Sequence, residues 1–308
     1  MNLINGLLKG GYWPICRVYA RRLGDRPADV LLRLLCVPQF LRVNRYWPNF
    51  VKPRRFSEKL WSRQLRDRDP KLTMISDKLL VRDYVAGKVG IDYLVPLLWR
   101  GDNPEEIPFD ELPNKFVIKT NHGCEYNIIV YDKTKLDREK AKQQLKKWLG
   151  ENFGQDTFLG IAWGYKNIRP TIFIESFIED HGKVPVDYKF WCFSGKVEFI
   201  SLHFDRFENY STLSFSRNFE LGGGLNFGLP LYSGTFKVPS NYKEIVRVAE
   251  SLAEGFDFIR VDLYMVENKI YFSELTPYPG GVTTRFVPVK QDFQLGEKWC
   301  DFKIYTLK

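Results

Sequence analysis

Two carboxylates near the C-terminal end of the chain lie in a pattern that is typical of a β-hairpin. Residues 258–277 read FIRVDLYMVENKIYFSELTP, with a run rich in β-branched and aromatic residues on each side of a central Glu-Asn. We expect a three-residue turn at this point, because Asn268 tolerates a left-handed backbone. In this register the predicted cross-strand pairs are Arg260 with Thr276, Val261 with Leu275, Asp262 with Glu274, and Met265 with Tyr271.

The predicted register gathers polar residues on one face of the hairpin and leaves the other face apolar. A two-residue turn would instead put Asp262 and Glu274 on opposite faces, so the hydrophobic alternation favours the longer turn. Two facing carboxylates repel each other unless a cation lies between them. Mg²⁺ prefers oxygen ligands and often takes one or two carboxylates together with substrate phosphates, so it suits this pair. The alternative is an acid pair on an exposed sheet surface.

Three further motifs would suit a nucleotide. The strand KFVIKTN carries Lys119, and a turn at Gly123 follows it, so the lysine and backbone N–H groups would hold a phosphate. Glu175 ends the apolar run TIFIE, where a carboxylate would accept the exocyclic amine of adenine. Asp187 and Lys189 share one face of the strand VDYKFW and would meet a ribose hydroxyl and a terminal phosphate. The alternatives are a solvated lysine, an exposed edge glutamate and a simple ion pair.

Motifs of other nucleotide-binding classes are missing from the sequence. It has neither G-x-x-x-x-G-K-[ST] nor G-x-G-x-x-G, so P-loop and Rossmann interpretations lack support. Five scattered Cys without a C-x-x-C pair argue against a disulfide framework and against structural zinc. With only three His, a His-rich metal site is excluded. We expect a reducing compartment.

The elements that would position these motifs form an α+β pattern with antiparallel sheets. We expect a helix after Pro53 with Ser57 as its N-cap, and a second helix capped by Ser76 and ended by a glycine. A hairpin turns about Ser194-Gly195, and a helix covers 241–256. The predicted divisions begin with a basic helical segment at 1–56 and a helical region at 57–112, and the β-rich part follows.

The positive charge is concentrated at the start of the chain. Hydrophobic residues make up 44% and charged residues 27%, which excludes wholesale disorder. Residues 1–56 hold eleven Lys or Arg against two Asp, a net +9, and the rest of the chain sums to zero. Aromatic residues such as Trp13 and Trp47 are interleaved with these charges, so the segment would contact an anionic membrane surface or an acidic glycan. The alternative is a helical cap with a solvated basic face, and no motif predicts nucleic-acid binding.

The order of the motifs resembles the ATP-grasp superfamily, and more narrowly its TupA-like family, named for teichuronopeptide biosynthesis. The resemblance runs from about Lys52 to Gly296 through FSEKLWSRQLRDRDP, DK, FVIKTNHG, IFIESFIE, DYKFWCFSGKV and RVDLY…YFSELTPYPGG. It implies two α+β lobes with antiparallel sheets that sandwich ATP: a small lobe with a lid at 113–180, and a large lobe with the metal and acceptor sites at 181–308. Thr276 stands where the family pattern Glu-x-Asn has Asn, and it would offer a neutral oxygen. The loop HGCEYN is also poorer in Gly and Ser than the usual lid.

The resemblance also implies roles for individual residues. Those implied for ATP are Lys78, Lys119 and Gly123 at the phosphates, Glu175, Phe177 and Ile178 at adenine, Asp187 at the ribose, and Lys189 at the γ-phosphate. Those implied for the metal and the transfer step are Asp262, Glu274 and Thr276 for Mg²⁺, and Arg260 for the transferring phosphoryl group. Those implied for the acceptor are Thr283, Thr284 and Arg285, with His203, Asp205 and Arg206 in second rank.

The implied activity is ATP-dependent ligation of a carboxylate to an amine through an acyl phosphate. The carboxylate would belong to a uronic acid of an anionic surface glycan or its precursor, and the amine to an amino acid or amino alcohol. With no secretory signal at the start and no apolar run long enough to span a bilayer, we expect a cytoplasmic protein, peripheral at the inner face of the membrane.

Three other functions stay open. Asp67-Arg68-Asp69 is a D-x-D, which glycosyltransferases use to hold a metal and a sugar nucleotide, although a solvated charge run is the plainer interpretation. The other two are a non-catalytic protein that binds nucleotide or glycan on the same fold, and a kinase that phosphorylates a hydroxyl.

Overall fold

The structure is a computed structural model that describes residues 27–153, 162–205, 209–222, 229–280, 285–286 and 288–306, with side chains from residue 36 onward. The sequence predictions that fall outside these residues concern the segment 1–26, Arg206, Thr283 and Thr284.

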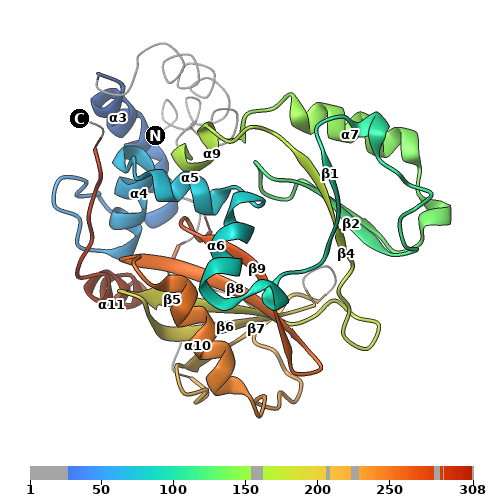
Figure 1. Cartoon of the computed structure of the whole chain (residues 1–308). Coiled ribbons are helices and arrows are strands. Elements are labelled where there is room, and N and C mark those ends of the chain that lie inside the picture. The colour runs from blue at the N-terminus through green and yellow to red at the C-terminus, as the bar shows by residue number, and fades with distance from the viewer. Residues whose placement is uncertain are drawn as a thin grey trace.

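Four helices precede the strands in the described part of the chain, and another, α11, follows the last strand (Figure 1). The α-helices are α3 (Pro27–Asn44), α4 (Phe56–Arg66), α5 (Pro70–Ser76), α6 (Leu80–Val89), α7 (Arg138–Leu149), α9 (Trp163–Lys166), α10 (Tyr242–Ala253) and α11 (Lys290–Lys298). Short 3₁₀ turns are η2 (Ile91–Tyr93), η3 (Pro104–Glu106) and η4 (Lys133–Lys135).

Nine strands form two antiparallel sheets. The strands of the smaller sheet are β1 (Leu97–Gly101), β2 (Phe116–Thr120), β3 (Asn127–Val130) and β4 (Ile172–Ser176), in the order β1-β4-β2-β3. The strands of the larger sheet are β5 (Asp187–Phe193), β6 (Lys196–Phe204), β7 (Ser211–Ser216), β8 (Phe258–Val266) and β9 (Lys269–Thr276), in the order β7-β6-β5-β8-β9. The α+β fold with antiparallel sheets is therefore confirmed, as counted over the residues just given.

Each sheet buries one face against a helix. In the smaller sheet Phe116, Ile118 and Ile174 pack with Leu145 of α7. In the larger sheet the alternate residues of β5, β6 and β8 form one core with α10, which lies across that face in Figure 1. Because side chains alternate along a strand, the other face of each sheet must carry the polar residues.

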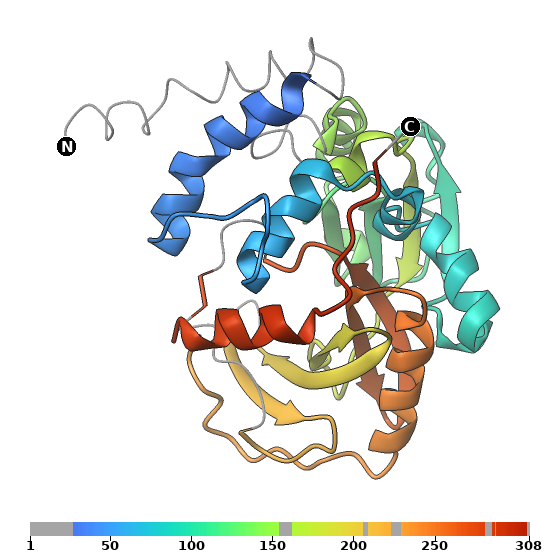
Figure 2. The same ribbon diagram turned by 90° about the vertical axis from the view of Figure 1, so that its left-hand side faces the viewer.

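Aromatic side chains replace the polar ones on this face of the larger sheet where β5 ends and β8 begins. Phe56 of α4, Trp191 of β5, Phe258 of β8 and Trp299 after α11 are buried together there. Figure 2 shows α11 beside this end of the sheet and the C-terminal tail running on past α4. The tail is held by its backbone, because the N–H of Arg68 donates to the carbonyl of Tyr305 at 2.8 Å.

The two predicted N-caps are wrong. Ser57 lies inside α4 and binds Asp292 of α11 through its N–H and its hydroxyl, at 2.8 and 2.6 Å. Ser76 ends α5, and Asp77 instead accepts from the N–H groups of Leu79 and Leu80 at the start of α6. An aspartate caps as well as a serine does, so residue type alone did not separate the neighbours.

The predicted pairing of the two hairpin carboxylates is confirmed, but by a different turn. The turn has two residues, Glu267 and Asn268, both with positive φ. A β-bulge at Ser273 then adds one residue to β9, which restores the register of Asp262 opposite Glu274. Nearer the turn the expected pair of Met265 with Tyr271 is wrong, since Met265 lies opposite Ile270.

Candidate active site

A row of polar side chains crosses the free face of the larger sheet. Ser201, Lys189, Asp262 and Glu274 are register neighbours on β6, β5, β8 and β9. The ammonium of Lys189 lies 2.6 Å from Asp262 Oδ2 and 2.6 Å from Asp187 Oδ2. All three of these charged side chains are buried. A buried lysine between two buried aspartates is an unusual arrangement for a surface sheet, and it marks this face as a candidate site.

Arg260 links the two hairpin carboxylates. Its guanidinium donates to both oxygens of Asp262, at 2.7 and 2.6 Å, to Glu274 Oε1 at 3.0 Å and to the Thr276 hydroxyl at 3.1 Å. Burial opposes ionisation of Asp262, yet Arg260 and Lys189 together lower the pKa of its carboxyl. Burial likewise lowers the pKa of Arg260, and the neighbouring carboxylates, Asp262 first, raise it overall. The positive charge between Asp262 and Glu274 in this structure is thus the guanidinium of Arg260.

The donor set still suits a divalent cation, mainly through Glu274. Its side chain is 42% exposed, whereas that of Asp262 is 1% exposed with both oxygens bonded to cations. Glu274, Asp262 and the Thr276 hydroxyl offer hard oxygen donors on one face. Over the described ranges no group of three or more His, Cys, Asp or Glu forms a metal cluster. A Mg²⁺ ion here would therefore need substrate oxygens to complete its shell.

In the smaller sheet, Lys119 and Glu175 meet on the face that α7 leaves free. Lys119 Nζ lies 2.6 Å from Glu175 Oε2. Arg82 of α6 binds the other oxygen, Oε1, at 2.6 Å, and donates to the Val95 carbonyl at 2.8 Å. Both oxygens of Glu175 are thus occupied by cations. Arg82 was missed by the sequence analysis, because no local pattern connects it with a residue 93 positions away.

The loop after β2 contacts Lys78, which lies near Glu274 of the β8–β9 hairpin. Lys78 donates to the carbonyl of Gly123 in this loop. Burial lowers the pKa of Lys78, while the charge of Glu274 is near enough to oppose this shift. The thiol of Cys124 lies 3.5 Å from the Tyr165 hydroxyl, and burial raises the pKa of both groups. The structure thus brings Lys78 and Gly123 together near Glu274, and it adds Tyr165, which no sequence signal indicated.

The remaining predicted residues are more scattered. His203 is buried beside the row and bonds to the Ser201 hydroxyl at 2.7 Å and the Tyr210 hydroxyl at 2.5 Å. Phe177 follows β4 and packs against Tyr131, 5.2 Å between ring centroids. Ile178 is half-buried next to it. Arg285 Nε is buried and has no hydrogen-bond partner in the described part of the chain.

The D-x-D sequence has a structural role. Asp67 is buried at the end of α4, where Oδ1 accepts from the N–H groups of Asp69 and Tyr305, both at 3.1 Å. Asp69 caps α5 by accepting from the N–H of Lys71 at 2.9 Å. The pair thus ends one helix, starts the next and holds the C-terminal tail. These contacts account for both carboxylates without a metal.

Two lobes whose polar sheet faces carry paired lysines and carboxylates define a protein of the ATP-grasp class. Residues 58–300 match the family described as TupA-like ATP-grasp. The chain therefore belongs to the TupA-like ATP-grasp family. A comparison with curated protein sequences gives no match.

Solved structures similar to this chain include two ligases. D-alanine–D-alanine ligase from Bacillus anthracis, complexed with ATP, has a TM-score of 0.43 at 18% identity, over 75% of this chain and 66% of that one. Phosphoribosylamine–glycine ligase from Thermotoga maritima has a TM-score of 0.45 at 13% identity, over 82% of this chain and 62% of that one. This chain thus spans just under two thirds of the length of these two proteins.

Proposed function

We propose that this protein is an ATP-dependent carboxylate–amine ligase that joins an amino acid or amino alcohol to a uronic acid of a surface polysaccharide or its precursor. The observation that carries the proposal is the contact of Arg260 with both Asp262 and Glu274, beside the buried ammonium of Lys189. Membership of the TupA-like ATP-grasp family supports the use of ATP. The polysaccharide substrate is proposed from the process for which that family is named, teichuronopeptide biosynthesis.

The proposed reaction has two steps. The substrate carboxylate attacks the γ-phosphorus of ATP, which forms an acyl phosphate and breaks the bond to ADP. The amine then attacks the acyl carbon, phosphate leaves, and the nitrogen loses a proton as the amide forms. Both steps bring negative groups together, so fixed cations are the main contribution a protein can make. Arg260 and Lys189 are those cations at the transferred group, and Lys78 and Lys119 are those at the remaining phosphates.

The side chains of Asp262, Glu274 and Thr276 would hold Mg²⁺. The ion would neutralise phosphate charge and orient the γ-phosphoryl group. Glu274 would be the outward-facing ligand, because its side chain is 42% exposed. Asp262 would exchange a contact with Lys189 or Arg260 to join it, and this exchange would free a cation for the substrate.

The adenine contacts are proposed for the segment just after β4, and the ribose contact for the first residue of β5. Phe177 and Ile178 follow β4 and would contact the adenine ring, and Asp187 would accept from a ribose hydroxyl. The contacts of Glu175 favour a role in holding Lys119 toward the phosphates, since Arg82 and Lys119 already occupy its two oxygens. Acceptance of the adenine amine would require Glu175 to give up one of them.

The acceptor is proposed to bind near the segment after β9. Arg285 suits a carboxylate, and its partly unsatisfied guanidinium supports this role. Thr283, Thr284 and Arg206 keep the substrate roles that the family resemblance implies. His203 is proposed to reach the same substrate from β6.

A product trap tests the ligase proposal most simply. The full chain is incubated with Mg²⁺, ATP and a panel of uronic acids, with hydroxylamine as a general amine, and both ADP and hydroxamate are measured. The proposal predicts that both appear together with one or more of the acids. Glu274→Gln should abolish them, and Glu111→Gln, a change at an exposed carboxylate, should not. ADP with a phosphorylated sugar and no hydroxamate would identify a kinase, and consumption of a UDP-sugar without ATP would identify a glycosyltransferase.

Peripheral contact with an anionic membrane is proposed through the loop after α3. Trp47 and Val51 are each 77% exposed, whereas Phe50 is buried. Every charged residue from 30 to 57 is basic. A tryptophan among basic residues suits a membrane interface, where each Lys or Arg contributes about 1 kcal/mol. The described helices include none that is long and apolar enough to cross a bilayer.

Vesicle co-sedimentation tests this contact. The protein should pellet with vesicles rich in phosphatidylglycerol and not with phosphatidylcholine vesicles. Trp47→Ala with Lys52→Gln should weaken this binding, whereas Ile91→Ala with Lys140→Gln, at exposed positions elsewhere, should not. Equal binding by the two double variants would contradict the proposed surface. Cytoplasmic localisation is part of the same proposal and is tested by fractionation of cells.

A further inference from the structure

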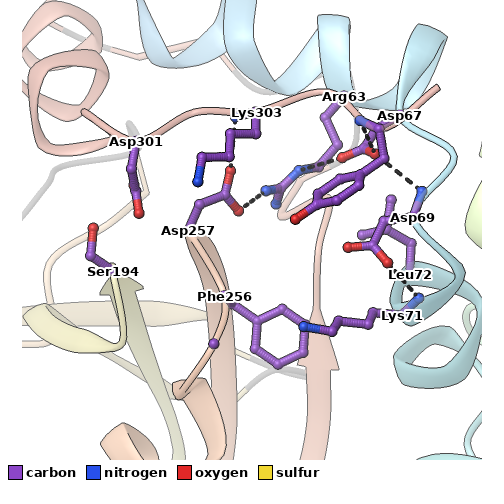
Figure 3. Close-up of a pocket in the computed structure, with 12 residues that line it drawn as sticks. Arg63, Asp67, Asp69, Lys71, Leu72, Ser194, Phe256, Asp257, Asp301 and Lys303 are labelled. Atoms are coloured by element: carbon purple, nitrogen blue, oxygen red, sulfur yellow. Dashed lines mark hydrogen bonds and ion pairs between the residues drawn. The ribbon is translucent and has the colours of Figure 1, made fainter.

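A pocket separate from the candidate active site opens where α4 and α5 meet the β5–β6 turn and the C-terminal tail (Figure 3). Its volume is about 260 Å³. Ser194 lies in its wall at one end of β5, while Lys189 lies five positions earlier in the same strand. The buried aromatic residues Trp191 and Phe258 fill the intervening face of the sheet.

The inner wall of this pocket is fixed by charges that already have partners. Arg63 donates to the carbonyl of Phe258 at 2.9 Å and forms an ion pair with Asp257. Asp257 also accepts from the indole N–H of Trp299 at 2.8 Å. These bonds hold Arg63 and Asp257 in place, and the two side chains thereby shape the inner wall of the pocket.

The rim carries four charged side chains, of which Asp69 already caps α5 and the others lack an ion-pair partner among the described residues. Figure 3 shows Asp301 and Lys303 at one end of the space, and Asp69 and Lys71 at the other. Neither ammonium forms an ion pair with any described residue, and Asp301 Oδ1 is buried without a hydrogen-bond partner there. A buried carboxylate oxygen without a hydrogen-bond donor destabilises the fold. A ligand that donates a hydrogen bond to Asp301 would remove this penalty.

We propose that this pocket binds a free α-amino acid. The ligand's ammonium pairs with Asp301, its carboxylate pairs with Lys303, and its side chain extends past Phe256 toward Asp69 and Lys71. The volume of about 260 Å³ lies just below the roughly 300–1,000 Å³ of pockets for drug-sized ligands, which agrees with a ligand as small as an amino acid. The inference stands apart from the proposed ligase activity, since no catalytic candidate lines the pocket.

Binding measurements on the full chain test this site without ATP or turnover. Saturation-transfer NMR and calorimetry are carried out with glycine, L-alanine, D-alanine, L-glutamate and L-lysine. Acetate and methylammonium, each with one charged group, serve as half-ligands. At least one amino acid should bind, and each half-ligand should bind more weakly by about tenfold or more.

Variants then locate the binding. Lys303→Gln changes an exposed side chain whose backbone contact to Asp257 remains, so it should fold, and Asp301→Asn is the second variant. Each should weaken amino-acid binding by about tenfold, while Glu274→Gln should not change it. The controls Asp92→Asn and Lys140→Gln, at exposed positions, should also leave it unchanged.

Three results would overturn the proposal. The first is that no amino acid binds the folded protein at millimolar concentration. The second is that acetate binds as tightly as the amino acids, which would indicate a simple anion site. The third is that Glu274→Gln abolishes binding while Lys303→Gln and Asp301→Asn leave it intact, which would place the ligand in the candidate active site.

Discussion

Glu175 accepts hydrogen bonds from Arg82 and Lys119 through different oxygens, both at 2.6 Å. The arrangement fixes the lysine of β2 by means of a carboxylate of β4 and an arginine of α6. Of the three, only Arg82 comes from outside the smaller sheet, and it also donates to the Val95 carbonyl just before β1. Arg82 is thus a positioning residue for Lys119.

Removal of Arg82 should therefore weaken nucleotide binding, although Arg82 itself is not proposed to contact the nucleotide. In Arg82→Ala, Glu175 keeps one cation and draws Lys119 toward itself, so we expect ATP to bind about tenfold more weakly. Arg82→Lys should restore part of the loss. Arg169→Ala, which breaks only an exposed ion pair with Asp102, is the control and should bind like the wild type. Calorimetric ATP affinities that are the same in Arg82→Ala and the control would contradict this role.

Asp67 should make stability depend on pH between about pH 4 and 6. Burial raises the pKa of its carboxyl to about 6, against the opposing effects of Arg63 and two backbone N–H groups. The folded protein thus binds this proton more tightly than the unfolded chain does. The stabilising contribution is complete below the unfolded pKa and is lost as pH rises through the folded pKa, a change of about 3 kcal/mol.

Asp67→Asn isolates this effect because the amide oxygen can still accept from Asp69 and Tyr305. Relative to the wild type, the variant should gain stability as pH rises from about 4 to 7. Denaturant midpoints of both proteins across this range measure the difference. Curves that stay parallel would mean that Asp67 does not titrate there.

Two helical glycines should respond to alanine in opposite directions. A Cβ at Gly296 of α11 would overlap the carbonyl oxygen of Arg54 and lie 2.8 Å from the Cα of Arg55, at the start of α4. We expect Gly296→Ala to destabilise the fold by about 1–3 kcal/mol. Gly87→Ala in α6, where a Cβ meets nothing within 4 Å, should stabilise it by roughly 0.5–1 kcal/mol. Equal thermal midpoints for the two variants would contradict the close approach of α11 to α4.

The sequence predicts most of the regular elements because their signals are local. The strands of the β5–β6 and β8–β9 hairpins and helix α10 follow the expected periodicity. The turn at Ser194-Gly195 has the positive φ values that a tight hairpin needs. By contrast, the sequence pattern indicates a loop where β7 lies, and it indicates no helix where α11 lies. Both are stabilised by tertiary contacts, β7 by pairing with β6 and α11 by packing on α4.

The candidate site was predictable where one strand or hairpin carries it. Asp187, Lys189, Arg260, Asp262 and Glu274 alternate on strands, so their shared face could be inferred. The bulge at Ser273 could not, because a bulge depends on how the whole strand pairs. Nor could the two bonds of Glu175 or the approach of Lys78 to Glu274, since each joins segments far apart in the sequence. The structural role of Asp67 was hidden for the same reason, because one of its partners, the N–H of Tyr305, lies in the distant C-terminal tail.

Calorimetry of Mg²⁺·ATP binding tests the central claim most directly, with wild type, Lys119→Ala and Glu274→Gln under identical conditions. The account predicts micromolar binding by the wild type that weakens without Mg²⁺ and is lost in both variants, with circular dichroism showing that all three proteins are folded. A folded wild type that binds no ATP in the presence of Mg²⁺, or binding that neither substitution changes, would contradict the account.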